Sequence, residues 1–356
     1  MAFSFFNRFA RQFRGAMERV RVSRALSPIT PIGSTTAEPS SDRDPTEERP
    51  VYLPPEIAQD VPPLWLDRPD ALDRLQRSNA PEEMKTTARE LILDGFTVIR
   101  GAIDPALCDQ VIADYGEYSR QNRSYVDENL DVNGREKRLV NFHHWSDAEM
   151  QIGCNARIMN TLDFIFDREA CVYTSLTFKY GTQQPIHRDT PHFATWPDSY
   201  FVGVWTALED VDPQAGPLQY HPGGHRFDVD QHAIIERVEI DFPDLPRAEQ
   251  LALALDIYNG QIIERSPREG RGLEVSPLRK GDTAIWHAQL PHGGYPVGNP
   301  DLSRWSVVFH CAPSDVQVYQ HDTFFSHRGP GLAPIRYGFE ERRGRRVALA
   351  GGVAFM

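Results

Sequence analysis

The sequence has no hydrophobic run that approaches the roughly 18 residues a helix needs to cross a bilayer, so no membrane-spanning segment is predicted. It is also short of positive charge. Its 38 Lys and Arg residues are outnumbered by 50 Asp and Glu residues, which gives a formal net charge of −12 over 356 residues. A general nucleic-acid binder needs a basic face to displace counterions, so this balance argues against one and favours a small-molecule substrate.

Cysteine is scarce, and its spacing is uninformative about metals or disulfides. The four cysteines lie far apart with no Cys-x-x-Cys pair, at Cys108, Cys154, Cys171 and Cys311. This spacing signals neither a zinc ribbon nor a disulfide framework. We therefore expect a protein of a reducing compartment, the cytoplasm.

Two segments precede the expected folded core. Residues 1–26 are predicted to form a basic amphipathic helix, in which Phe residues recur at helical spacing and Arg residues fall on the other side. Through residues 2–24 such a helix suits peripheral contact with an anionic membrane surface; an organelle-targeting presequence and a frayed arm are the alternatives. Residues 27–63 are rich in Pro, Ser, Thr, Asp and Glu, which predicts a disordered linker.

The main domain is predicted over residues 64–320, followed by a C-terminal extension over 321–356. Helices are expected from about residue 81 to 93, from 104 onward, and from 146 to 166. Strands are expected in short runs rich in β-branched and aromatic residues, at Cys171–Tyr180, Phe201–Leu208, Leu218–His221, Thr283–Ala288 and Arg304–Cys311. This pattern favours a mainly β fold with flanking helices, an antiparallel sandwich or barrel of jelly-roll type.

A long segment interrupts the strands at residues 227–272. It is predicted to contain a helix over about 246–263 and then a charged loop over 265–271. Segments of this length between sheet strands are usually functional, so we expect an insertion or lid that selects the substrate. A solvated surface loop is the alternative.

The chemistry-bearing stretch begins at His187, which is followed two residues later by Asp189. In an extended chain residues i and i+2 share a face, so an imidazole and a carboxylate could reach one metal ion there. A single His-x-Asp is weak on its own, because a chain with 12 histidines contains about one by chance. The features that follow it are what give it weight.

Four downstream features accompany the pair, in the order Trp205, the turn Gly216–His225, His292 followed by two glycines, and Arg304. In order and spacing the chain resembles the phytanoyl-CoA dioxygenase family of Fe(II)- and 2-oxoglutarate-dependent oxygenases, over roughly residues 85–312. Two small departures are Gly224, where the family turn has Ser, and Pro291 before the distal histidine. The resemblance implies a double-stranded β-helix, the cupin-like form of the jelly roll.

The resemblance also implies a site and a reaction. His187, Asp189 and His292 would bind Fe(II), which leaves adjacent positions open for 2-oxoglutarate and O₂. Arg304, with Ser306 as a further donor, would bind the distal carboxylate of 2-oxoglutarate, and Trp205 would lie beside it. The expected reaction hydroxylates an unactivated C–H bond of a small-molecule or lipid-linked metabolite and yields succinate and CO₂.

Several alternatives remain open. His287 and His310 also lie on expected strands, and His192 with Phe193 would line either the substrate mouth or a packed loop. Desaturation or ring closure could start from the same hydrogen abstraction, whereas a halogenase is disfavoured because Asp189 is present. A catalytically silent binding protein and a zinc-bound, cupin-like hydrolase or isomerase are the remaining classes. A basic cluster for acyl-CoA phosphates could come from Arg265, Arg268 and Arg271.

Overall fold

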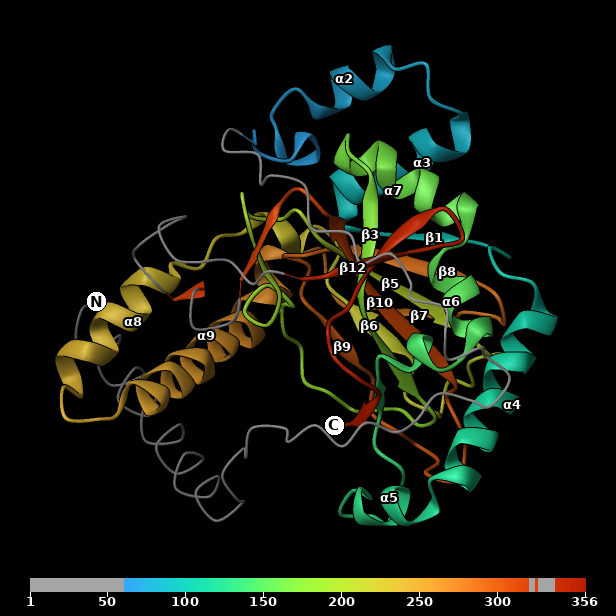
Figure 1. Cartoon of the computed structure of the whole chain (residues 1–356). Coiled ribbons are helices and arrows are strands. Elements are labelled where there is room, and N and C mark those ends of the chain that lie inside the picture. The colour runs from blue at the N-terminus through green and yellow to red at the C-terminus, as the bar shows by residue number, and fades with distance from the viewer. Residues whose placement is uncertain (1–60, 320–323, 326–336) are drawn as a thin grey trace.

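The computed structural model describes residues 61–319, 324–325 and 337–356 (Figure 1). The helix predicted at residues 1–26 and the linker up to residue 60 lie outside the described residues. In the described part of the chain, no helix combines the length and the apolar composition that crossing a membrane would require.

The centre of the molecule is a nine-stranded sheet with two small sheets beside it. Its path runs β1-β8-β5-β10-β3-β13-β12, with β2 paired to β3 and β14 paired to β2. The strands are β1 (Phe96–Ile99), β2 (Leu139–Val140), β3 (Ala170–Phe178), β5 (Val202–Ala207), β8 (Thr283–His287), β10 (Ser306–Pro313), β12 (Phe339–Arg342), β13 (Arg345–Ala348) and β14 (Ala354–Phe355). The small sheets are β7 (Glu274–Ser276), β6 (Leu218–Tyr220) and β9 (His292–Gly294), and β11 (Gln317–Tyr319) with β4 (Ala194–Trp196). The predicted mainly β architecture with flanking helices is confirmed.

Side chains alternate between the two faces of the large sheet, as the period of two in a strand requires. On β5, Val202 and Val204 pack in the same apolar cluster as the helices, whereas Trp205 and Ala207 belong to a second cluster between the sheets. On β10, Phe309 faces the helices and Val308 faces inward. The inner face is therefore free to carry a site.

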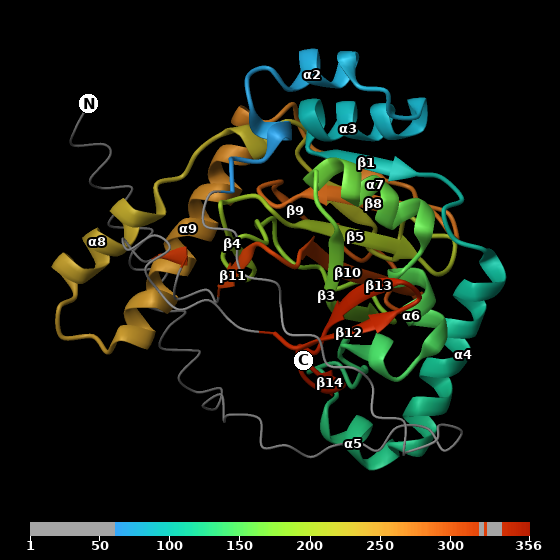
Figure 2. The same ribbon diagram turned by 45° about the horizontal axis from the view of Figure 1, so that its top comes forward.

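Helices cover the outer face of the large sheet (Figure 2). They are η1 (Trp65–Asp67), α2 (Ala71–Arg77), α3 (Glu82–Asp94), α4 (Pro105–Gln121), α5 (Arg123–Glu128), η2 (Phe142–His144), α6 (Asp147–Gly153) and α7 (Ala156–Phe166). The prediction of one helix over 146–166 was wrong, because the chain breaks after Gly153. The side chain of Asn155 accepts the backbone N–H groups of Arg157 and Ile158 and so begins a new helix.

The insertion at residues 227–272 is a helical hairpin, with η3 (Gly224–Arg226) before it. Helices α8 (Gln231–Asp241) and α9 (Arg247–Glu269) lie side by side at one end of the sheet (Figures 1 and 2). The prediction of a charged loop over 265–271 was wrong for most of its length, since α9 continues to Glu269. Ion pairs at (i, i+4) spacing, Arg265 with Glu269 and Arg268 with Glu264, lie along this last part of the helix.

A buried carboxyl group fixes α6 to β3 on the helix-covered side. Ser175 and Thr177 each donate a hydroxyl hydrogen bond, both at 2.7 Å, to the two carboxylate oxygens of Glu149. Burial raises the pKa of Glu149 from 4.5 to about 7, although these two hydrogen bonds oppose the shift. The folded protein therefore keeps a proton that the unfolded chain releases.

This proton predicts a stability that depends on pH. Because the pKa of Glu149 is higher in the folded protein than in the unfolded chain, proton binding to Glu149 stabilises the fold. This contribution to the free energy of unfolding is fully present below pH 4.5 and is lost as pH rises through about 7. The Glu149→Gln variant lacks the titrating group. From pH 5 to pH 8 the free energy of unfolding of wild type should therefore fall by roughly 2–3 kcal/mol more than that of the variant. Urea unfolding of both proteins across this range measures the difference. An identical pH dependence in the two proteins would contradict the assignment.

Candidate metal centre

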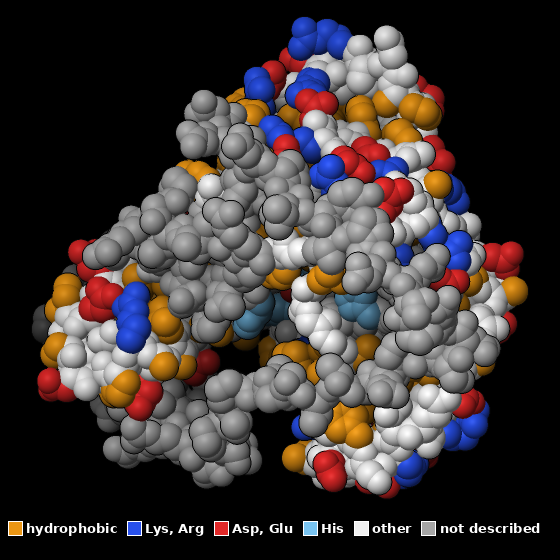
Figure 3. Space-filling view, viewed as in Figure 1, with side chains coloured by type: hydrophobic (Ala, Val, Ile, Leu, Met, Phe, Trp, Pro, Cys, Tyr) orange, Lys and Arg blue, Asp and Glu red, His pale blue; other side chains and the backbone are white. Residues whose placement is uncertain are grey.

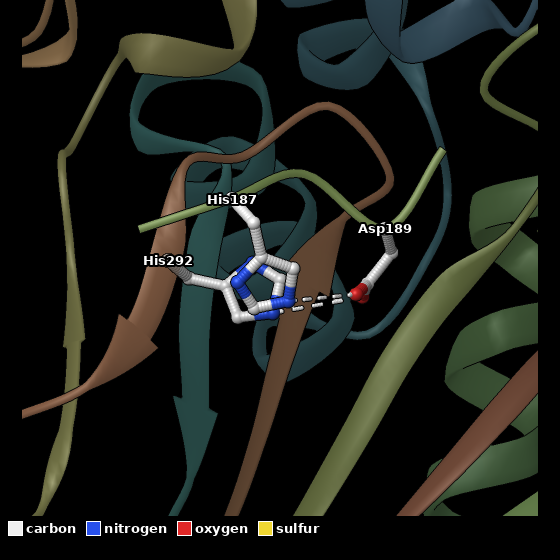
Figure 4. Close-up of side chains that lie close together, drawn as sticks. All are labelled: His187, Asp189 and His292. Atoms are coloured by element: carbon white, nitrogen blue, oxygen red, sulfur yellow. Dashed lines mark ion pairs between the residues drawn. The ribbon is translucent and has the colours of Figure 1, made fainter. Parts of the chain in front are cut away.

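His187 and His292 are held side by side by their own backbones. The two residues form an isolated antiparallel bridge, in which the N–H of His187 donates to the carbonyl oxygen of His292 at 2.9 Å and the reverse bond is 3.0 Å. Directly opposed residues of an antiparallel pair point their side chains to the same face. Asp189 follows two residues after His187 and points its carboxylate at both imidazoles (Figure 4).

The three side chains can share one ion. A possible ligand atom from each lies within 4.8 Å of the others. Nε2 of His187 is 3.4 Å from Oδ1 of Asp189, and Nε2 of His292 is 3.6 Å from Oδ2. Two ligand atoms that bind one metal at about 2.1 Å and at a right angle lie about 3 Å apart. The observed separations are close to that value, so the donor set fits a metal ion.

Backbone carbonyls fix both imidazoles in the tautomer that a metal needs. Nδ1 of His187 lies 2.9 Å from the carbonyl oxygen of Pro185, and Nδ1 of His292 lies 2.9 Å from that of Leu290. A carbonyl oxygen only accepts, so each Nδ1 carries the proton and each Nε2 presents its lone pair. The amide nitrogen of Gln184 is 3.0 Å from Nε2 of His187 and donates to it.

The carboxylate of Asp189 is ionised although it is buried. Burial alone would raise the pKa of Asp189, but His292 and His187 beside it lower that pKa well below its usual range. Burial lowers the pKa of His292 to about 4, against the attraction of Asp189, so this imidazole is neutral at pH 7. Oδ2 of Asp189 also accepts a hydrogen bond of 2.8 Å from the indole N–H of Trp286. Trp286 thereby orients the carboxylate.

Glycines make the close contacts around the site achievable. A Cβ on Gly293 would lie 2.6 Å from the carbonyl oxygen of Gln184, in the segment that carries His187. The glycines after His292 therefore allow the two backbones to approach closely. Gly203, opposite Trp286 in the β5–β8 pairing, has the same role, since a Cβ there would lie 2.2 Å from the indole ring. Larger residues at either position would displace the ligands or their support.

The three ligand side chains line a cavity of about 520 Å³ on the inner face of the sheet. Figure 3 shows histidine side chains within a hollow of this face of the molecule. Trp205, Trp286, Arg304 and His310 line the same cavity. Ser306 is fully buried, and its hydroxyl donates to the carbonyl oxygen of Arg304 at 3.4 Å. Ser306 is not among the described residues that line the cavity.

Arg304 is a buried cation at the cavity wall. Its Nη1 donates to the carbonyl oxygen of Gly216 at 3.2 Å, and its Cζ lies 5.7 Å from the ring centroids of both Phe178 and Trp205. Within the described residues it forms no ion pair, and its Nε is buried without a hydrogen-bond partner. Burial lowers the pKa of Arg304 to about 10, so it remains charged at pH 7. A buried, unpaired guanidinium of this kind fits the carboxylate of a ligand.

The other histidine candidates lie outside the ligand set. Nε2 of His287 is 3.1 Å from Oδ1 of Asp67, so His287 belongs to a separate polar contact. Nδ1 of His310 is 2.8 Å from the hydroxyl oxygen of Thr174, so His310 forms part of the cavity wall. His192 and Phe193 also line the cavity.

The insertion is placed away from this wall. None of the described residues that line the cavity comes from the segment 227–272. It is connected to the metal motif by Arg188, which donates to the carbonyl oxygens of Gly224 at 2.9 Å and Phe227 at 2.7 Å, and by Ile186, which packs against the apolar cluster of the hairpin. Arg271 pairs with Asp94, so each arginine of the basic cluster considered for acyl-CoA has a carboxylate neighbour.

Three residues near the ligands are absent from the sequence-based site: Gln184, Trp286 and Arg138. Gln184 lies three residues before His187 and Trp286 six residues before His292, so proximity in sequence was an available signal. Arg138 precedes β2, far from either motif, and only the pairing of β2 with β3 brings it to the cavity.

Comparison with known proteins agrees with this geometry. The family model for phytanoyl-CoA dioxygenase (PhyH) matches residues 92–305, more than half of the chain. Peroxisomal phytanoyl-CoA dioxygenase from Mus musculus is 30% identical over 139 residues, which are 39% of this chain and 36% of the mouse protein. The rat protein is 30% identical over 115 residues, or 32% of this chain and 29% of the relative. The chain thus spans about a third of the length of the curated relatives that it matches.

Solved structures show the same fold. The epimerase SnoN in complex with Fe³⁺, α-ketoglutarate (2-oxoglutarate) and nogalamycin RO has a TM-score of 0.51 at 18% identity, and the match covers 76% of this chain and all of SnoN. The non-heme α-ketoglutarate-dependent carbocyclase SnoK has a TM-score of 0.50 at 15% identity, covering 72% of this chain and 92% of SnoK.

Of the expected cofactors, iron and 2-oxoglutarate are ligands of SnoN, and the His-Asp-His ligand set of this chain could hold a metal ion. The resemblance found in the sequence is confirmed by the family match over residues 92–305: the chain belongs to the phytanoyl-CoA dioxygenase family.

Proposed function

We propose that this protein is an Fe(II)- and 2-oxoglutarate-dependent hydroxylase that acts on an unactivated C–H bond of a small-molecule or lipid-linked metabolite. One observation carries the proposal: a single cavity contains both the His-Asp-His ligand set and a buried guanidinium with no acidic partner among the described residues. The first suits a ferrous ion, and the second suits one end of a dicarboxylate.

In this proposal His187, Asp189 and His292 hold the iron on one side and leave its other positions to the co-substrate and O₂. Bound iron and 2-oxoglutarate would supply the oxidant: one atom of O₂ would enter succinate as 2-oxoglutarate loses CO₂, and the other would be inserted into the C–H bond. The protein contributes ligand geometry. The carbonyl oxygens of Pro185 and Leu290 hold the imidazole rings, and Trp286 holds the carboxylate.

Arg304 is proposed to bind the distal carboxylate of 2-oxoglutarate, with the ring of Trp205 against the co-substrate. Arg304 is 3% exposed, so water competes little for its N–H groups. Ser306 is proposed as a second donor to this carboxylate. Its bond to the Arg304 carbonyl is long at 3.4 Å and therefore weak, which leaves the hydroxyl available.

The first prediction concerns the metal ligands. His187→Ala and Asp189→Ala should each abolish 2-oxoglutarate-dependent O₂ consumption, because two remaining ligands hold Fe(II) poorly, while the circular dichroism spectrum stays unchanged. His232→Ala, at an exposed histidine of α8, is the matched control and should retain activity. Full turnover in either ligand variant would show that the metal site lies elsewhere.

The second prediction concerns Arg304. Arg304→Ala should raise the KM for 2-oxoglutarate by at least about tenfold, because a charged hydrogen bond to the co-substrate is lost. Arg304→Lys should fall between wild type and Arg304→Ala, since an ammonium group keeps the charge but not the fork of two N–H donors. Succinate release at varied 2-oxoglutarate measures this. Unchanged apparent affinity in Arg304→Ala would move the role to another residue.

The third prediction concerns the support of the ligands. Trp286→Phe removes the N–H that orients Asp189 and should weaken Fe(II) binding about tenfold in an anaerobic titration. Trp65→Phe is the matched control, because the Trp65 indole N–H donates instead to the carbonyl oxygen of Phe164, between elements of the helical layer. Equal losses of Fe(II) affinity in the two variants would assign the effect to general destabilisation.

A further inference from the structure

The segment that carries the first two metal ligands also carries two residues that face away from the cavity. His187 and Asp189 line the cavity, and Ile186 and Arg188, which alternate with them, do not. Ile186 packs against the apolar cluster of the α8–α9 hairpin, and the guanidinium of Arg188 reaches the chain that leads into this hairpin. The ligand segment therefore has the cavity on one side and the insertion on the other.

Arg188 is held by the base of the insertion. It is 2% exposed, and its Nη2 donates to the carbonyl oxygens of Gly224 at 2.9 Å and Phe227 at 2.7 Å. Its Cζ lies 4.3 Å from the ring centroid of Phe227. Burial lowers the pKa of Arg188, and Tyr258 of α9 opposes that shift, in part through a hydrogen bond. One side chain thus joins the residue between two metal ligands to the start of the insertion and to its second helix.

The turn before the hairpin also contacts the segment of the third ligand. The N–H of His221 donates at 3.0 Å to the carbonyl oxygen of Pro291, which directly precedes His292. A Cβ on Gly224 would lie 2.9 Å from Cδ of Pro291. Gly224 and Pro291 are the two departures from the family pattern, and the structure places them against each other. Gly224 leaves the room that the proline ring needs.

These contacts are how the insertion reaches the site. Among the described residues, none from the segment 227–272 lines the cavity, so the insertion acts on the site through the two ligand segments. Groups that orient metal ligands without touching the metal typically change metal affinity about 10- to 100-fold. A support that holds both ligand segments from behind can therefore affect metal binding strongly.

We propose that Arg188 is a positioning residue for the metal site, and that the turn 221–227 fixes both ligand segments to the helical hairpin. The insertion thereby sets the affinity of the site for its metal, instead of closing over a substrate. This inference rests on the proposed function in one respect, the assignment of a metal ion to His187, Asp189 and His292.

The test titrates the full-length, metal-free protein with Co(II), whose visible d–d absorption reports the ligands around it. Arg188→Met loses both hydrogen bonds, so it should weaken Co(II) binding at least about tenfold and change the d–d spectrum at saturation. Arg188→Lys keeps a charged donor and should lose less. Arg345→Met is the matched control and should bind Co(II) as wild type does. Arg345 is likewise held by two hydrogen bonds, to Asp163 and Asn160, but does not line the cavity.

A second variant tests the same support without removing a charge. Gly224→Ala adds the Cβ that would press on Pro291, and the φ of Gly224 is not positive, so alanine causes no backbone strain there. This variant should also weaken Co(II) binding. Adding Pro291→Ala should restore the affinity, because the ring carbon that blocks the new methyl group is then gone. General destabilisation would not be reversed in this way.

Wild-type Co(II) affinity in Arg188→Met would overturn the inference, and so would equal losses of affinity in Arg188→Met and Arg345→Met. If urea unfolding shows that Arg188→Met does not fold, Gly224→Ala decides, and an unchanged affinity in that variant overturns the inference as well. A wild-type protein that binds no Co(II) would instead refute the metal site of the proposed function, and the positioning role of Arg188 with it.

Discussion

The pair of backbone hydrogen bonds between His187 and His292 is the constraint on which the site depends. Neither residue lies within a long strand, so neither imidazole is positioned by a regular ladder. The bridge opposes the two residues directly, and the carbonyl oxygens of Pro185 and Leu290 then set the rotation of each ring. Gly293 completes this arrangement, because a side chain there would push the two segments apart.

Successive side chains of each strand point to opposite faces of the large sheet, so one face packs against the helices and the other shapes the cavity. Residues such as Val204 and Phe309 point outward and fix the helices, while their neighbours Trp205 and Val308 point inward and shape the cavity. The helix-covered side also contains the buried Glu149, whose proton affects stability far from the metal ligands. Changes to the inner face can therefore alter ligand binding while the outer packing keeps the fold.

The sequence was sufficient where the signal was local. The strands, and the order of His187, Asp189, His292 and Arg304, followed from alternation and motif spacing. Contacts that depend on strand register could not be predicted from the sequence. The clearest example is the hydrogen bond from the Trp286 indole to Asp189, for which Gly203 on the neighbouring strand leaves room. Two helix boundaries were missed: the break between α6 and α7, where Asn155 caps the new helix, and the continuation of α9 past Pro267 to Glu269. The pairing of β12–β14 with the sheet had no sequence signal that we used.

The separation of the ligands along the chain has a consequence for folding. His187 and His292 are more than a hundred residues apart, and the intervening chain includes β5, β6, the α8–α9 hairpin and β8. Closing so long a loop costs conformational entropy that early local structure does not offset. The contact between His187 and His292 is therefore expected to form late in folding. A metal ion would thus bind only once the tertiary structure is complete. By binding the native state alone, iron would stabilise the native topology relative to partly folded chains.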